Sequence, residues 1–160
     1  MLQFEQMFDN IKAICGGELI VDHNATPRII TVVPAELKKI CAHLLKDATS
    51  YFDFLSCVTG IDNGEAAGTM EVVYHLYSIP FNHHLGLKVV IPRENPVVDS
   101  VSEIWRTAGW HEREIYDLLG IKFMGHPDLR RILLPADWEG FPLRKDYRHQ
   151  EYYRSIKVEY

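Results

Sequence analysis

The sequence predicts an α+β fold, a two-layer domain in which helices pack on one face of a mostly antiparallel sheet. Three observations indicate this class. Apolar residues recur at helical spacing near the start, the middle of the chain alternates as strands do, and a helical pattern then returns. No repeat or low-complexity linker interrupts the chain, so we expect one α+β body over residues 1–125. Residues 126–160 are expected to form an irregular, extended C-terminal docking segment.

The first elements follow from apolar spacing and from the residues that end each run. Residues 2–15 carry apolar side chains three and four positions apart, which predicts an amphipathic helix, and the glycine pair 16–17 ends it. Residues 19–23 and 28–33 are predicted to be short strands joined by a turn. Pro34 suits the first position of a second helix.

The middle of the chain is predicted to supply most of the sheet. Residues 51–61 are largely apolar and are followed by the turn signal Asp62-Asn63-Gly64. Residues 70–78 and 85–91 carry apolar side chains at alternate positions, as strands with one buried face do. These three strands would therefore form the centre of the sheet.

Two further helices are predicted before the irregular region. Asn95-Pro96 should begin a helix that runs to Ala108 and is ended by Gly109. Residues 110–119 should form a short helix that Gly120 closes.

The composition narrows the function classes. The chain has 160 residues, of which 47% are hydrophobic and 24% charged, as in one folded domain. Residues 1–120 hold nine basic against sixteen acidic side chains, a net charge of −7, whereas residues 121–160 hold eight against six, a net charge of +2. An acidic body gives no electrostatic case for nucleic acid. No apolar run reaches the ~18 residues that cross a bilayer, and the start lacks a signal-peptide pattern, so membrane contact is expected through a partner.

The cysteines and paired histidines give no sign of a metal site. Cys15, Cys41 and Cys57 lie far apart, whereas iron–sulfur and zinc sites usually need closely spaced thiolates. We expect all three to be small buried hydrophobic residues in a reducing compartment. His83 and His84 are neighbours on a predicted hairpin rim and should point in opposite directions.

The densest cluster of charges lies in residues 110–121. On a helix Arg113 and Asp117 share a face, whereas Glu112 and Glu114 point to different faces and cannot bracket one substrate bond. We favour a structural interpretation, in which acidic neighbours hold Arg113 and the group faces a partner. Acid–base chemistry is the alternative.

Residues 123–133 are predicted to form a tight corner followed by an arginine pair. Gly125 and Pro127 suit the corner, and Asp128 can cap the turn that follows. Arg130 and Arg131 present planar donor groups to carboxylates within the chain or on a neighbour.

Residues 134–147 interleave aromatic and arginine side chains with prolines in an extended path. Trp, Tyr and Arg carry much of the binding energy at protein interfaces, so we interpret this run as a docking strap. The alternative is a surface tail that folds back on its own domain. About forty largely irregular residues exceed what the packing of a small domain requires.

In their order and spacing, these three blocks resemble the signature of the C subunit of bacterial NADH:quinone oxidoreductase, respiratory complex I. The resemblance is strongest over the last third of the chain. Leu119 stands where the family often has Phe, and residues 148–153 are more charged than expected. The positions expected to dock other subunits are these signature residues and Trp138 of the strap: Glu112, Arg113, Glu114, Asp117, Gly125, His126, Pro127, Asp128, Arg130, Arg131, Trp138, Gly140, Pro142, Leu143, Arg144, Lys145 and Asp146.

The resemblance implies a non-catalytic, hydrophilic subunit in the peripheral arm of a proton-translocating complex. Such a subunit would pack on the D subunit of the complex and scaffold its quinone-reducing end, with the B and I subunits close by. NAD, FMN, iron–sulfur clusters and quinone would belong to the parent complex, and this chain would bind none of them. It would lie on the cytoplasmic side of the cell membrane as a peripheral protein that supports electron transfer from NADH to quinone.

Two alternatives stay open at this point. The same scaffold is implied for membrane-bound hydrogenases and for ferredoxin- or cofactor F420-linked dehydrogenases. The other alternative is a stand-alone acid–base enzyme using Glu112, Glu114, Asp117 and His126, which requires these groups to converge in one pocket. By itself, His126 is more often a hydrogen-bonded structural histidine than a ligand.

Overall fold

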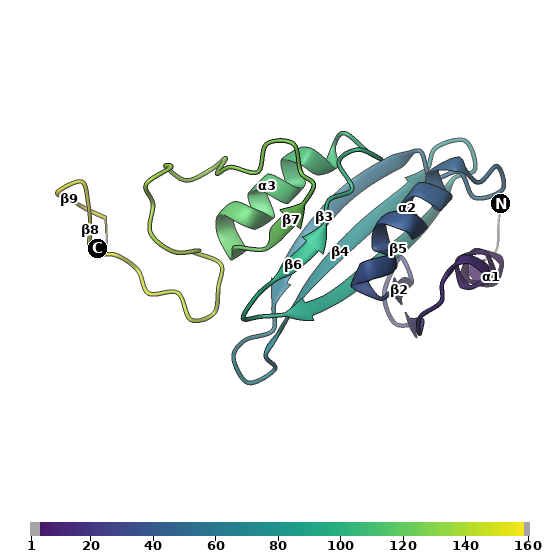
Figure 1. Cartoon of the computed structure of the whole chain (residues 1–160), viewed down its shortest axis with the longest axis horizontal. Helices are drawn as coiled ribbons and strands as arrows, with labels where there is room; N and C mark the ends of the chain where they lie inside the picture. The colour runs from purple at the N-terminus through teal and green to yellow at the C-terminus, as the bar shows by residue number, and fades with distance from the viewer. Residues whose placement is uncertain (1–3, 159–160) are drawn as a thin grey trace.

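The computed structural model describes residues 4–158, and its main part is a five-stranded sheet with three helices (Figure 1). The helices are α1 (Phe4–Ile14), α2 (Leu37–Lys46, entered through the 3-10 turn η1, Pro34–Glu36) and α3 (Ala108–Leu119). The sheet contains β1 (Ile20–Asp22), β2 (Ile29–Thr31), β3 (Phe54–Asp62), β4 (Thr69–Ser78) and β5 (His83–Pro92). The predicted α+β class is confirmed.

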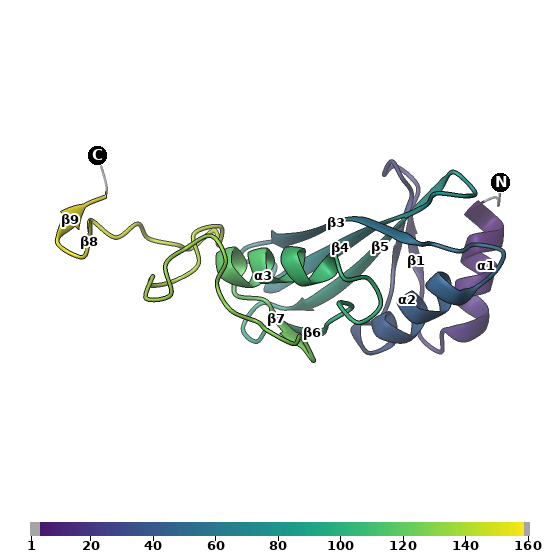
Figure 2. The ribbon, with the colours of Figure 1, turned by 90° about the horizontal axis from the view of Figure 1, so that it is seen from above.

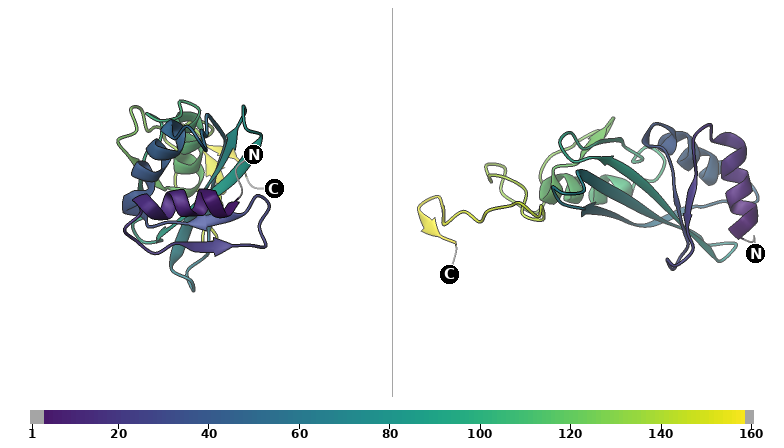
Figure 3. Two further views of the ribbon diagram at one scale, coloured as in Figure 1. Left: turned by 90° about the vertical axis from the view of Figure 1, so that its right-hand side faces the viewer. Right: turned by 90° about the horizontal axis from the view of Figure 1, so that it is seen from below.

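The sheet has the strand order β1-β2-β5-β4-β3 and is antiparallel except at the β2–β5 pair. Alternation along the strands turns one face into the core, where Met70, Val72 and Tyr74 have no exposed surface. Figures 1 and 2 show α2 and α3 on this face, and Figure 3 shows α1 at the β1–β2 end. The helices thus bury the apolar face that the alternation predicted.

The expectation for the paired histidines is confirmed, and the expectation for the cysteines is confirmed only in part. His83 is buried and its neighbour His84 is exposed, so the two side chains do point in opposite directions. Of the three free cysteines Cys41 is buried as expected, whereas Cys15 and Cys57 are partly exposed. Among residues 4–158 no three potential metal ligands lie together, and none of the helices there has the length and apolar character to cross a membrane.

The helix predicted from Asn95-Pro96 to Ala108 is wrong. Val97–Asp99 forms strand β6, which pairs in parallel with β7 (Lys122–Met124), and turns follow up to α3. The β-branched Val97 and Val98 favour an extended backbone, and β7 supplies a partner that the local pattern did not reveal. Gly109 therefore lies inside α3 instead of ending a helix.

The chain beyond β7 has little regular structure. The strands β8 (Tyr152–Tyr153) and β9 (Ile156–Lys157) pair with each other, far from α1. In Figures 1 and 2 the last residues, drawn in yellow, extend away from the body. The division into a body over residues 1–125 and a docking segment over residues 126–160 stays a prediction.

Candidate docking site at the end of helix α3

The C-terminal segment caps helix α3. The last four carbonyls of any α-helix lack partners within the helix. Gly120, at φ +76°, ends α3 as predicted, and its N–H bonds the first of these carbonyls, that of Tyr116, at 2.9 Å. The segment supplies the other three donors: Arg131 Nη1 to Asp117 O at 2.9 Å, Leu143 N–H to Leu118 O at 3.0 Å, and Arg144 Nε to Leu119 O at 2.8 Å.

The buried side chain of Asp117 organises the segment directly. Its Oδ2 accepts the backbone N–H groups of Ile132, Leu133 and Leu134 at 2.9, 2.7 and 2.9 Å. Its Oδ1 accepts Arg131 Nη1 at 2.7 Å. Burial alone would raise the pKa of this carboxyl, but these donors outweigh it, so the pKa lies below its ordinary value. One carboxylate thus fixes four consecutive residues.

A second anchor joins the segment to the end of β3. Asp62 is buried and accepts Arg93 Nε and Nη2 at 2.8 and 3.1 Å, as well as the backbone N–H of Lys145 at 2.9 Å. Arg93 also donates to Asp146 at 2.6 Å. The hydrogen bonds from Arg93 are the main reason that the pKa of Asp62 is lowered. Sequence reasoning missed both residues of this anchor, because it assigned Asp62 to a turn and had no local signal for Arg93.

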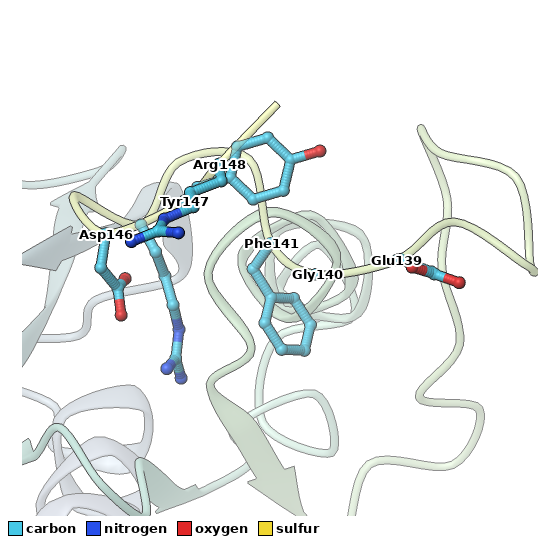
Figure 4. A pocket seen from close by; sticks show the side chains of 7 residues that line it. Glu139, Gly140, Phe141, Asp146, Tyr147 and Arg148 are labelled. Atoms are coloured by element: carbon cyan, nitrogen blue, oxygen red, sulfur yellow. The ribbon is translucent and has the colours of Figure 1, made fainter. Parts of the chain in front are cut away.

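The ring of Phe141 is held between the segment and α3. The guanidinium carbons of Arg131 and Arg144 each lie 5.3 Å from its centroid. A Cβ at Gly120 would lie 2.6 Å from this ring, so the close approach needs glycine. Figure 4 shows Phe141 and Tyr147 pointing to opposite sides at a pocket of about 360 Å³.

Trp138 and Gly140 of the strap make further contacts. The indole N–H of Trp138 donates to Tyr147 Oη at 3.1 Å, and the Gly140 carbonyl accepts Arg131 Nη2 at 2.9 Å. Pro142 is partly exposed, and the side chains of Leu143 and Lys145 are exposed although their backbone N–H groups are bonded. The strap therefore folds back on the body through its main chain and leaves several side chains free.

The predicted corner at Gly125 is present, with φ +79°. His126 lies behind it, where Nδ1 accepts the Asp128 N–H at 3.0 Å and Nε2 contacts the Gly109 carbonyl at 3.0 Å. This pair of contacts places the ring proton on Nε2 and confirms a hydrogen-bonded structural histidine. Pro127 completes the corner and is exposed. The Asp128 carboxylate accepts Arg130 Nε at 2.9 Å instead of capping the turn.

The expectation that acidic neighbours hold Arg113 is wrong. Arg113 Nε and Nη2 donate to the carbonyls of Arg130 and Arg131, each at 3.1 Å. Asp117, its expected partner four residues on, is buried and pairs with Arg131. The carboxylate is taken by a donor that only the folding-back of the segment brings near.

The residues of the acid–base alternative do not share a pocket. Glu112 is 0% exposed and accepts the Ser100 hydroxyl at 2.6 Å and the Val101 N–H at 2.8 Å. Glu114 lines a pocket beside β3, and neither Glu112 nor His126 is among the residues that line this pocket. His126 Nε2 lies 4.0 Å from Glu112, with both ring nitrogens already in hydrogen bonds. This arrangement does not support an acid–base site built from these residues.

Glu112→Gln is expected to remove a pH dependence of stability. Burial raises the pKa of Glu112 from 4.5 to about 7 despite the bonds from Ser100 and Val101. The folded state therefore binds a proton more tightly than the unfolded state, so this contribution is full below pH 4.5 and lost as pH rises to about 7. The wild type should lose on the order of 3 kcal/mol of unfolding free energy across that window.

Urea unfolding between about pH 4.5 and 7.5 measures this effect. The Glu112→Gln profile should be flatter than that of the wild type, whereas Glu114→Gln, on a different face of the same helix, should keep the wild-type slope. Identical slopes for Glu112→Gln and the wild type would contradict the prediction.

Comparison with solved structures identifies proteins that share this fold. The chain described as Nqo5 of the trypsin-resistant fragment (1–134) matches with a TM-score of 0.65 and 27% identity, covering 80% of this chain and 100% of that one. A chain of the membrane-bound sulfane sulfur reductase, an archaeal respiratory membrane complex, matches with a TM-score of 0.74 over 90% of this chain and 85% of that one. Its identity of 21% shows the fold alone. The class is thus an α+β domain with the fold that these two chains share.

The sequence comparisons then give the family. The family model for the respiratory-chain NADH dehydrogenase 30 kDa subunit matches residues 30–153. The C subunit of NADH-quinone oxidoreductase from Chloroherpeton thalassium is 45% identical over 142 residues, 88% of this chain and 58% of that protein. Its counterpart from Chlorobium phaeobacteroides is 42% identical over 141 residues, 87% of this chain and 84% of that protein. The chain belongs to the family of NADH-quinone oxidoreductase C subunits, the 30 kDa subunit family of complex I.

Proposed function

We propose that this chain is a non-catalytic subunit of the peripheral arm, which docks on the D subunit through its C-terminal segment. One observation carries the proposal. The backbone of the segment is fixed to α3 and β3, yet Leu133 and Leu143 remain 62% and 59% exposed. Large apolar side chains held outward on a fixed backbone are typical of a surface that another protein covers.

The proposed setting follows from the family. The D subunit would be the main partner, with the B and I subunits nearby, and the chain would scaffold the quinone-reducing end of a proton-translocating complex. NAD, FMN, iron–sulfur clusters and quinone would be bound by other subunits. The chain would lie on the cytoplasmic side of the membrane and reach the bilayer through the complex.

A hydrogenase-type or ferredoxin- or F420-linked complex is the second candidate. We keep this candidate because the chain shares its fold with a chain of the archaeal respiratory complex, and a fold alone does not distinguish the two kinds of complex. The relatives at 42% and 45% identity favour NADH:quinone oxidoreductase.

Removing the two exposed leucines should reduce assembly. The double variant Leu133→Ser/Leu143→Ser keeps both backbone N–H groups, so its fold should survive while an apolar contact is lost. We expect at least about tenfold lower recovery of partner subunits when the tagged chain is purified from its native host and identified by mass spectrometry. The matched control is Ile20→Ser/Ile79→Ser, whose side chains are 58% and 60% exposed on the body.

The outcomes separate the candidates. Lower recovery of partner subunits in the leucine variant alone supports docking through the segment. An equal decrease in recovery in both variants contradicts it. Wild-type recovery with the B, D and I subunits supports the respiratory setting, and recovery with a nickel-bearing large subunit supports the second candidate. A wild-type chain recovered alone would overturn both.

A further inference from the structure

A pocket of about 430 Å³ lies between α3 and residues 129–136. Arg113 and Tyr116 line it from the helix, and Arg130 and Arg131 from the segment. Its remaining lining residues are apolar, and no carboxylate is among them. The pocket is therefore lined by three arginines and by apolar residues, and arginine is suited to planar anions.

The three arginines differ in how far their charge is neutralised. Arg131 is paired with the fully buried Asp117, and Arg130 with Asp128 in an exposed pair that solvent screens. Arg113 has no carboxylate within 4 Å of its guanidinium anywhere in residues 4–158, since backbone carbonyls hold its Nε and Nη2. Its positive charge is thus fixed in position and uncompensated.

An exposed aromatic ring extends this site. Trp110 is 64% exposed one helical turn before Arg113, and the guanidinium carbon lies 5.5 Å from its ring centroid. Trp and Arg are the residues most enriched among those that dominate binding energy at interfaces. A guanidinium held by carbonyls and by a ring needs little ordering when a partner binds.

We infer that this pocket receives a carboxylate side chain of the subunit on which the C-terminal segment docks. The inference rests on the proposed function and names the chemistry of the partner at one point of the interface. The charge distribution favours it, since residues 1–120 carry a net charge of −7 and would repel an acidic partner surface elsewhere. Arg113 is an exception within this acidic part of the chain, and it would direct an acidic group to the pocket between α3 and the segment.

Carbodiimide cross-linking in the assembled complex tests the contact directly. Arg113→Lys introduces an amine that can form an amide with a carboxylate in contact, releasing the activated oxygen as the urea, and mass spectrometry then identifies the joined peptides. We expect a cross-link from position 113 to an Asp or Glu of a partner subunit. Arg28→Lys is the positive control for the reaction, because Arg28 lies 3.0 Å from Glu5 and should give a link within the chain.

Charge reversal gives an independent readout. Arg130→Glu changes a side chain that is 72% exposed, so the fold should be unaffected and thermal unfolding should match the wild type. We expect at least about tenfold weaker recovery of partners, against no loss for Lys12→Glu, an exposed reversal on α1.

The results distinguish this inference from the proposed function. Suppose that the wild type recovers its partners. The inference alone would then be overturned if the cross-links from position 113 stay within this chain, or if Arg130→Glu recovers partners as well as Lys12→Glu does. Failure of the wild type to recover any partner would overturn both.

Discussion

Asp117→Asn is expected to release the C-terminal segment from helix α3. Both carboxylate oxygens of Asp117 act as acceptors, one for Arg131 and one for three backbone N–H groups. An amide has one acceptor oxygen, so its NH2 group must face a donor on one side. Removing one partner of a buried pair costs about 3–5 kcal/mol, because the remaining charge stays buried.

Limited trypsin digestion measures the release. Cleavage after Arg130, Arg131 and Arg144 should become fast in Asp117→Asn, and recovery of partner subunits should fall by at least about tenfold. Asp128→Asn removes the carboxylate of an exposed pair in the same region and should change unfolding by less than about 1 kcal/mol. Similar digestion of the two variants would contradict the role assigned to Asp117.

The contribution of Asp117 also has a defined pH dependence. Its pKa is lowered in the folded state, so its contribution is present above the ordinary carboxyl pKa of 3.8 and lost as pH falls below that value. The Glu112 contribution changes in the opposite direction and at higher pH. The difference in unfolding free energy between the wild type and Asp117→Asn should therefore shrink as pH falls from about 4 to 2, whereas the difference between the wild type and Glu112→Gln should change between about pH 4.5 and 7.

The second large effect is expected for Gly120→Ala. Position 120 has φ +76°, which disfavours any side chain, and a Cβ there would lie 2.6 Å from the Phe141 ring. The backbone strain should cost about 1 kcal/mol and the displaced ring about 1–3 kcal/mol more. Gly125→Ala is the matched control, with φ +79° and nothing within 4 Å of its Cβ, so it should show the strain alone.

A double-mutant cycle isolates the contact with the ring. In a Phe141→Ala background the extra cost of Gly120→Ala over Gly125→Ala should disappear, because no ring is left to displace. Urea unfolding of the single and double variants provides the energies. An undiminished difference would show that Phe141 does not set the requirement for glycine at position 120.

Among the residues that the sequence predicted to dock a partner, the structure distinguishes two groups. Asp117, Arg131 and Arg144 hold the segment to α3, whereas Leu143 and Arg130 are exposed and available to a partner. Glu112 belongs to neither group, since its buried side chain bonds Ser100 and Val101. Residue type alone did not distinguish these situations, because a carboxylate in the sequence carries no record of its burial.

By itself the sequence determined the features that depend on neighbouring residues. Alternation predicted β4 and β5, and glycines at positions 120 and 125 marked the places where the backbone turns with positive φ. The same local pattern failed over residues 97–108, where β-branched residues found a strand partner well beyond the reach of any local pattern, at residues 122–124.

The tertiary structure decided which groups meet. Asp62 bonds the backbone of Lys145, 83 positions later, and Asp117 takes Arg131 in place of Arg113. Periodicity reports the conformation of a short stretch of chain, whereas the choice among competing donors depends on which of them the fold buries beside the acceptor. Asp117 therefore became the centre of the candidate docking site through its burial at the end of α3, where three backbone N–H groups and one guanidinium converge.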